Sequence, residues 1–235
     1  MLELIEFGTL NGQASLGKGI CTFTATSEYN QSSLTGSTAS LGNASGEATS
    51  TVNEVNGVRT AKSGSGELAI SYRGLENPWG NTWCMIGNVI ISGDGKQNGG
   101  VPYICKDYNY SYASLANNYH NTGFSLPNAH GWISRLGYGN KEYDWVLMPS
   151  AINDGNSVLP IGDSVWVTEN LNSIRTVVFG GSWAFEDSNG LFYYGCDKMP
   201  TNTMFKSYGA RLMFVPTKNS IYTANITKWQ QEVGA

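Results

Sequence analysis

The chain is poor in charged residues, in long apolar runs and in basic clusters, and each shortage narrows what it can be. Charged residues make up 14% of its 235 residues, against about 25% in ordinary soluble domains. The net charge is -4, and no basic patch points to nucleic acid. No run approaches the ~18 apolar residues of a membrane span. The opening MLELIEFGTLNGQ lacks a basic start and a long apolar segment, so we expect no signal peptide.

Histidine and cysteine are also scarce. The two histidines, His120 and His130, sit in neither an HxH nor an HExxH pattern, and no G-x-S-x-G elbow suggests a serine nucleophile. His120 is interpreted as a loop residue rather than a base. The four cysteines are Cys21, Cys84, Cys105 and Cys196, and no two of them form a CxxC pair. Neither zinc nor another cofactor is therefore expected, while one or two disulfide bonds stay an open alternative.

What the chain does have is glycine and aromatic residues. It contains 29 Gly, 13 Tyr and 7 Trp, while runs of good helix formers are nearly absent. This composition favours a loop-rich fold that contains β-strands. The clearest strands are expected at 83–92 and within RTVVFGG (175–181), and helices at about 113–119 and, as one alternative, in the C-terminal segment.

A change in composition near residue 67 predicts three regions. Residues 26–66 are about half Ser, Thr and Gly, and offer little to a core. This segment is either a flexible linker or a β-rich arm that packs on neighbouring chains. The predicted organisation is an N-terminal arm over 1–66 for attachment or oligomerisation, a domain over 67–217, and a C-terminal tail over 218–235.

Three short motifs follow in order along the chain: WGNTW (Trp79 to Trp83), GGSW (Gly180 to Trp183) and YGARLMF (Tyr208 to Phe214). Together they resemble a branch of the C-type-lectin-like proteins that contains formylglycine-generating enzyme, the variable proteins of diversity-generating retroelements and many phage tail and receptor-binding proteins. The resemblance covers about residues 67–216. It implies an α+β fold of the C-type-lectin-like kind, loop-rich, with short antiparallel strands and few helices, preceded by a β or irregular N-terminal arm.

The residues of these motifs are interpreted as scaffold. A glycine takes backbone conformations closed to other residues, an Asn bonds nearby backbone, and a Trp fills space under a loop. The arginine in the last motif is expected to hold a buried carboxylate or backbone carbonyls. The structural set is Trp79, Gly80, Asn81, Trp83, Gly180, Gly181, Trp183 and Arg211.

The candidate binding surface lies between the last two motifs, over 184–208, where neither strand nor helix periodicity fits. In the resembling family this surface varies and touches the partner, and aromatic residues among short polar ones suit such contacts. The alternative is that half of the aromatics, Phe192 and Tyr194 first, pack inward. The candidate ligand-binding residues are Phe185, Glu186, Asp187, Asn189, Tyr193, Tyr194, Asp197, Asn202 and Lys206.

The enzyme of the resembling family is a copper-dependent oxidase with a cysteine pair between the last two motifs. This chain has only Cys196 there, and a single thiolate is too little for copper. Cys196 is interpreted as a small apolar core residue, and we expect no enzymatic activity. The polar loop from Ile152 to Asp163 has a composition that suits a sugar site.

The resemblance implies a phage virion protein, a tail fibre or other fibre, whose lectin-like tip binds a host receptor such as a glycan or a surface protein. A homotrimer, assembled in the host cytoplasm with other virion proteins, is expected, with no nucleic acid and no membrane insertion. A purely structural capsid or tail decoration protein is the alternative, and a glycan-degrading enzyme is a third possibility.

Overall fold

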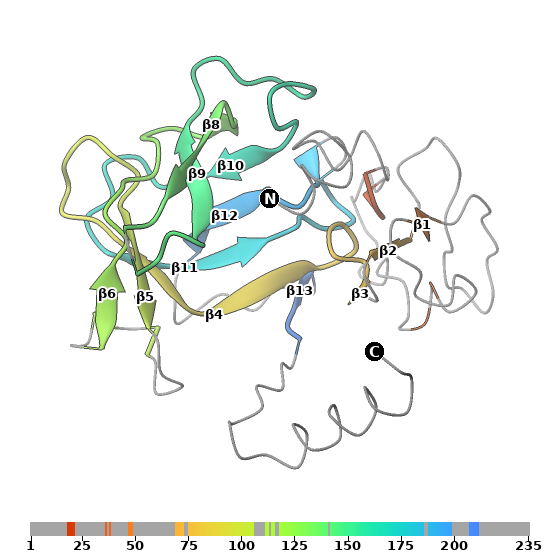
Figure 1. Cartoon of the computed structure of the whole chain (residues 1–235), viewed down its shortest axis with the longest axis horizontal. Helices are drawn as coiled ribbons and strands as arrows, with labels where there is room; N and C mark the ends of the chain where they lie inside the picture. The colour runs from red at the N-terminus through yellow and green to blue at the C-terminus, as the bar shows by residue number, and fades with distance from the viewer. Residues whose placement is uncertain are drawn as a thin grey trace, which may run out of the picture.

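The computed structural model of the chain describes residues 18–21, 36, 38, 47–48, 69–72, 75–105, 111–112, 114–115, 118–140, 142–185, 188–198 and 207–211. Strands account for 40% of these residues and helix for about 1%. The prediction of an α+β fold of the C-type-lectin-like kind is therefore wrong, since the described part of the chain is nearly all β (Figure 1).

The helix expected at about 113–119 is wrong at its described positions, while residues 113, 116 and 117 lie outside the described part of the chain. Tyr119 belongs to strand β6, Tyr119–Asn121, which pairs with β5 and packs Tyr119 against Ile90 and Cys105. This pairing and burial decide the local structure, because helix propensity is a weak preference that tertiary contacts override. The C-terminal segment considered as a helix lies outside the described residues.

The largest sheet has eight strands, in the spatial order β6-β5-β4-β11-β12-β10-β7, with β13 also paired to β4. The long β4 has the predicted bounds, and β5 pairs along its second half while β13 pairs at its start. Two pairs are parallel, β10 with β12 and β13 with β4. The further bounds are β4 Trp83–Ser92, β5 Val101–Cys105, β7 Gly131–Trp132, β10 Ser164–Trp166, β11 Ile174–Phe179, β12 Tyr194–Lys198 and β13 Tyr208–Gly209.

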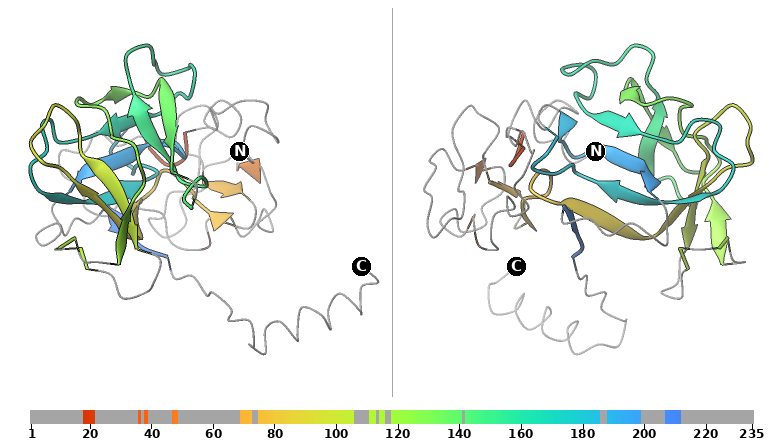
Figure 2. Two further views of the ribbon diagram at one scale, coloured as in Figure 1. Left: turned by 60° about the vertical axis from the view of Figure 1, so that its left-hand side comes forward. Right: turned by 180° about the vertical axis from the view of Figure 1, so that it is seen from behind.

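Two smaller sheets flank the large one (Figure 2). The hairpin of β8, Arg135–Tyr138, and β9, Leu147–Ala151, packs Leu136 and Met148 into the main core beside Val177. The other sheet has the order β1-β2-β3, with β1 Glu47–Ala48, β2 Ile70–Tyr72 and β3 Leu75–Glu76.

The main core lies between one face of the eight-stranded sheet and the β8–β9 hairpin. Alternation along β11 explains it: Val177 faces this core, while Val178 faces a second cluster with Trp83 and Tyr193 on the opposite side. The apolar run of β11 therefore covers both faces, which is why no clean alternation is visible in the sequence.

Parts of the predicted N-terminal arm pack closely on the rest of the molecule. Ile20 is fully buried with Ala69 and Trp183. The Glu76 carboxylate accepts hydrogen bonds from the Thr38 amide and hydroxyl, both 3.0 Å long, and β1 pairs with β2. These contacts place the few described residues of the arm against the rest of the described chain.

The WGNTW and GGSW motifs meet in space, and a segment of the arm joins them. The Gly80 amide donates to the Gly180 carbonyl at 2.8 Å, the Trp183 amide donates to the Asn81 carbonyl at 3.0 Å, and the Asn81 amide donates to the Ile20 carbonyl at 2.8 Å. A Cβ atom on Gly80 would lie 2.7 Å from the Ile20 nitrogen. We call this meeting of residues 18–21, 77–83 and 180–183 the three-segment contact.

The third motif reaches the same place. Tyr208 and Gly209 pair with Trp83 and Cys84 as β13. The Arg211 guanidinium donates to the backbone carbonyls of Glu76 and Asn77, at the edge of the three-segment contact. Backbone carbonyls were one of the two partners expected for this arginine, although its side chain is exposed rather than buried. All three motifs thus belong to one structural unit.

A glycine pair tests how closely this unit is packed. Gly181 and Gly95 both have φ of +78°, but a Cβ on Gly181 would lie 1.7 Å from the Asn189 side-chain oxygen, whereas one on Gly95 would make ordinary contact at 3.5 Å. We expect Gly95→Ala to lose about 1–2 kcal/mol of unfolding free energy from backbone strain alone. Gly181→Ala adds a steric clash and should lose at least about 2 kcal/mol more. Equal losses in urea unfolding would contradict the close packing.

Candidate binding groove

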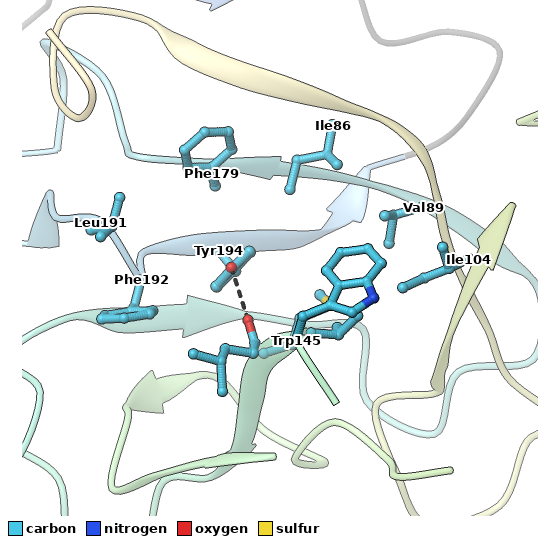
Figure 3. A pocket seen from close by; sticks show the side chains of 11 residues that line it. Ile86, Val89, Ile104, Trp145, Phe179, Leu191, Phe192 and Tyr194 are labelled. Atoms are coloured by element: carbon cyan, nitrogen blue, oxygen red, sulfur yellow. Dashed lines mark hydrogen bonds between the residues drawn. The ribbon is translucent and has the colours of Figure 1, made fainter. Parts of the chain in front are cut away.

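An open groove lies between the eight-stranded sheet and the β8–β9 hairpin, with a volume of about 270 Å³ (Figure 3). Its side chains come from β4, β5, β11 and β12 on the sheet side and from residues 145–148 on the hairpin side. The lining is apolar apart from the Tyr194 hydroxyl and the Trp145 indole N–H; it consists of Ile86, Val89, Ile104, Trp145, Val146, Leu147, Met148, Phe179, Leu191, Phe192 and Tyr194.

Trp145 is the exposed residue of this lining. Its side chain is 65% exposed, and its indole lies beside Val89 and Ile104 (Figure 3). The loop that carries it is fixed by buried Tyr143 and Val146, with the Val146 amide donating to the Tyr143 carbonyl at 2.9 Å. A large aromatic ring held at the mouth of an apolar groove is well placed to contact a partner.

Tyr194 joins the two walls of the groove. Its hydroxyl donates to the Leu147 carbonyl at 3.0 Å, from β12 to β9, as the dashed line in Figure 3 marks. Burial raises the pKa of Tyr194 well above its usual value, and the nearby Cys196 and Asp163 raise it further. The phenol is therefore neutral at physiological pH, and its hydroxyl proton is already used in the hydrogen bond to the Leu147 carbonyl.

The sequence stretch chosen as the binding surface divides between the groove and the interior. Tyr194 lines the groove together with its neighbours Leu191 and Phe192. Asn189 and Tyr193 are fully buried and cannot touch a ligand at the surface. Phe185 is half-buried in the cluster on the opposite side of the sheet, and Asp197 is half-buried in an ion pair with Lys198 at 2.9 Å. The positions of Glu186, Asp187, Asn202 and Lys206 lie outside the described residues.

Tyr193 and Phe185 form an aromatic cluster with Trp83. The rings of Trp83 and Tyr193 lie 4.6 Å apart between centroids, and those of Trp83 and Phe185 lie 5.3 Å apart at a steep angle. Such pairs stabilise a core beyond their buried area. Desolvation raises the pKa of Tyr193, which agrees with a role in this second core.

Asn189 closes the loop that follows the GGSW motif. Its side-chain oxygen accepts from the Ser182 amide at 3.1 Å, and its side-chain nitrogen donates to the Ser182 carbonyl at 2.8 Å. Both bonds are buried, so Asn189 holds the scaffold that brings Leu191, Phe192 and Tyr194 to the groove.

Sequence reasoning missed the hairpin side of the groove. Trp145 stands in YDWVLMPS, where nothing in the local pattern distinguishes an exposed Trp from a buried one. The exposure of Asp144, next to it, agrees with a loop position. Phe179 was included in the RTVVFGG strand, and its place at the end of β11 puts it on the groove face.

Groups that could support metal or thiol chemistry are sparse in the described part of the chain. No three His, Cys, Asp or Glu side chains converge there. All four cysteines are buried, and no disulfide joins them. Cys196 lies in the main core, where burial raises the pKa of its thiol. His120 and His130 are both exposed, and His130 stacks on Trp166 with ring centroids 4.7 Å apart.

Comparisons with known proteins do not assign the chain to a family. Comparison with protein-family models, with curated proteins and with solved structures gave no match. Within the described residues, no helix has the length and apolar character to cross a bilayer. The groove must therefore be interpreted from its own chemistry.

Buried thiols give the first test of this site. A thiol is reactive as the thiolate, and burial holds Cys196 in its neutral form. At pH 8 we expect negligible reaction of the native protein with a disulfide reagent such as DTNB over minutes. Four thiols should react after denaturation without reductant, because all four cysteines are free. A disulfide would lower that number, and rapid native reaction would contradict the burial.

Replacement of Asn189 tests whether the loop is scaffold. Asn189→Ala leaves the buried Ser182 amide without its partner, and leaves the Ser182 carbonyl with only the Phe185 amide, so it should lose about 1–3 kcal/mol of unfolding free energy. Asn172→Ala, at an exposed position, should stay within about 0.5 kcal/mol of the parent. Chemical denaturation measures both. Similar stability of the two variants would show that Asn189 is not part of the scaffold.

Proposed function

We propose that the chain is a non-enzymatic phage virion protein that binds a host surface receptor through the groove beside Trp145. The observation that carries this proposal is an exposed Trp at the mouth of an apolar groove. The order of the three sequence motifs supports the virion setting. A fibre with several copies of the chain, such as the expected trimer, would strengthen weak individual contacts through avidity.

The chemistry of the groove favours a protein receptor over a glycan at this position. Its walls offer hydrocarbon and aromatic surface, and the Tyr194 hydroxyl already donates to Leu147. A sugar would leave most of its hydroxyls without partners here, at a cost in free energy. An apolar or aromatic side chain of a surface protein would bury area without such a cost.

The alternative function is a decoration protein that binds only other virion proteins. It uses the same groove, and differs in predicting that the groove is covered in the assembled particle. A glycan-degrading enzyme would need two carboxylates across a cleft. The groove lining contains none, which makes this the least supported of the three functions.

Replacement of Trp145 tests the proposal. The side chain is 65% exposed, so Trp145→Ala should change stability by less than about 1 kcal/mol. Loss of a Trp at the centre of an interface costs about 2 kcal/mol or more, or ~30-fold in Kd. We expect binding of the labelled protein to host cells to weaken by that factor.

The matched control is Trp166→Ala, because Trp166 is 42% exposed and lies outside the groove. This variant should bind host cells like the parent. Equal binding by the parent and Trp145→Ala would refute the groove as the receptor site. Binding to virions but not to cells, sensitive to Trp145→Ala, would favour the decoration function.

A further inference from the structure

A second, polar pocket lies at the other end of the β8–β9 hairpin, with a volume of about 400 Å³. In the hairpin, Arg135 pairs with Ala151 at the polar end, whereas Tyr138 pairs with Leu147 at the groove end. The two sites share no lining residue. The polar pocket is lined by Ser134, Arg135, Ala151, Asn153, Asp154 and Pro160.

The backbone around this pocket is held by local hydrogen bonds. The Ser134 amide donates to the Ala151 carbonyl at 2.9 Å. The Asn156 side-chain oxygen accepts from the amides of Val158 and Leu159 at 2.8 and 2.9 Å, which fixes the far side of the loop. This loop falls within the polar stretch 152–163 whose composition suits a sugar site.

A β-bulge directs Arg135 toward the pocket. Arg135 pairs with Ala151 and Leu136 with Pro149, so Ser150 is an extra residue opposite them, and its hydroxyl donates to the Arg135 carbonyl at 3.2 Å. Bulges re-aim side chains and recur beside functional sites. Here the bulge lies directly at the one cationic residue of the lining.

Among the described residues, the charged and amide side chains of the pocket make no hydrogen bond or ion pair with each other or with the rest of the chain. The Arg135 guanidinium and the Asp154 carboxylate form no ion pair there, and neither they nor the Asn153 amide has a side-chain hydrogen bond. The backbone frame is thus satisfied, while one cation, one anion and one amide, all exposed to solvent, line the same hollow and are available to a ligand.

We propose that this pocket binds a sugar residue that carries a carboxylate, as part of a surface glycan. A guanidinium binds a carboxylate through two parallel hydrogen bonds. Asp154 accepts hydrogen bonds from sugar hydroxyls, Asn153 both donates and accepts, and Ala151 and Pro160 supply apolar contact for the C–H groups of the ring. The volume suits one or two sugar rings.

Other small ligands use the pocket less completely. A simple anion would pair with Arg135 but has no hydroxyl group to donate to the Asp154 carboxylate. An amino-acid zwitterion would match both charges, but would leave Asn153 and Ser134 without partners. The acidic sugar is the ligand that satisfies all four polar side chains. The polar pocket is separate from the Trp145 groove, so the sugar-binding proposal does not depend on the receptor function proposed above.

The test is an NMR titration of the purified full chain with three probes: methyl glucuronide (carboxylate form), methyl glucoside and L-serine. We expect the glucuronide to shift the amide signals of Ser134, Arg135, Asn153 and Asp154, and to bind about tenfold or more tightly than the glucoside, because the bond to Arg135 is charge-assisted. If these amide signals do not move at about 50 mM glucuronide, a concentration that saturates a millimolar site, the proposal is overturned.

Two variants assign the roles within the pocket. Arg135→Gln should reduce the affinity for the glucuronide to that for the glucoside, while Asp154→Asn should weaken the binding of both sugars. Lys96→Gln, which removes an exposed positive charge outside the pocket, is the control and should bind like the parent. The acidic-sugar assignment would be refuted if Arg135→Gln left the affinity for the glucuronide unchanged. It would also be refuted if the parent protein bound L-serine as tightly as the glucuronide.

Discussion

The Gly80 amide donates to the Gly180 carbonyl, and this bond joins two segments that are far apart in the chain. Both residues take positive φ, +72° and +90°, which glycine adopts readily, and a Cβ on Gly80 would lie 2.7 Å from the Ile20 nitrogen. Ile20 packs against the same place, and Trp183 covers it. The position of β11 against β4 continues directly from this contact. The loop after Gly180 then returns to β12 and supplies three residues of the groove wall.

The described structure separates its scaffold from its surfaces. The tryptophans of the first two motifs, Tyr193 and Asn189 are buried, whereas both pockets adjoin the β8–β9 hairpin. A hairpin packed on a large sheet through Leu136 and Met148 gives its ends a fixed position. The two ends of the hairpin and the following loop can therefore carry apolar side chains at one site and polar side chains at the other without disturbing the core. Binding residues on loops that a rigid scaffold positions are common in proteins.

Sequence reasoning was most reliable where burial dictates residue type. The apolar run 83–92 predicted β4 with its observed bounds, and the Trp residues of WGNTW and GGSW are buried in the structure. The helical content was mispredicted, because strand pairing of Tyr119 overrides a local propensity. Arg211 was expected on carbonyls or a carboxylate, and only the fold could decide between them.

The candidate sites were less predictable, because each combines residues from distant segments. In the FYY stretch, Tyr193 and Tyr194 point to opposite sides of the sheet, and one residue of uncertainty in the strand phase exchanges them. No local signal shows which of the two faces the groove. Trp145 and Arg135 reach their pockets only because the β8–β9 hairpin positions them, and the register of that hairpin includes the bulge at Ser150.

The three-segment contact also has a consequence for the order of folding. Its partners are brought together from residues near 20, 80 and 180, and Arg211 completes its edge. Strand β4 lacks its partner β11 until residues 174–179 have been synthesised, and it lacks β13 until residues 208–209 have followed. Folds dominated by such distant pairings form slowly and expose apolar strands while they do. The distance in sequence between these partners therefore places completion of the three-segment contact at a late stage of synthesis.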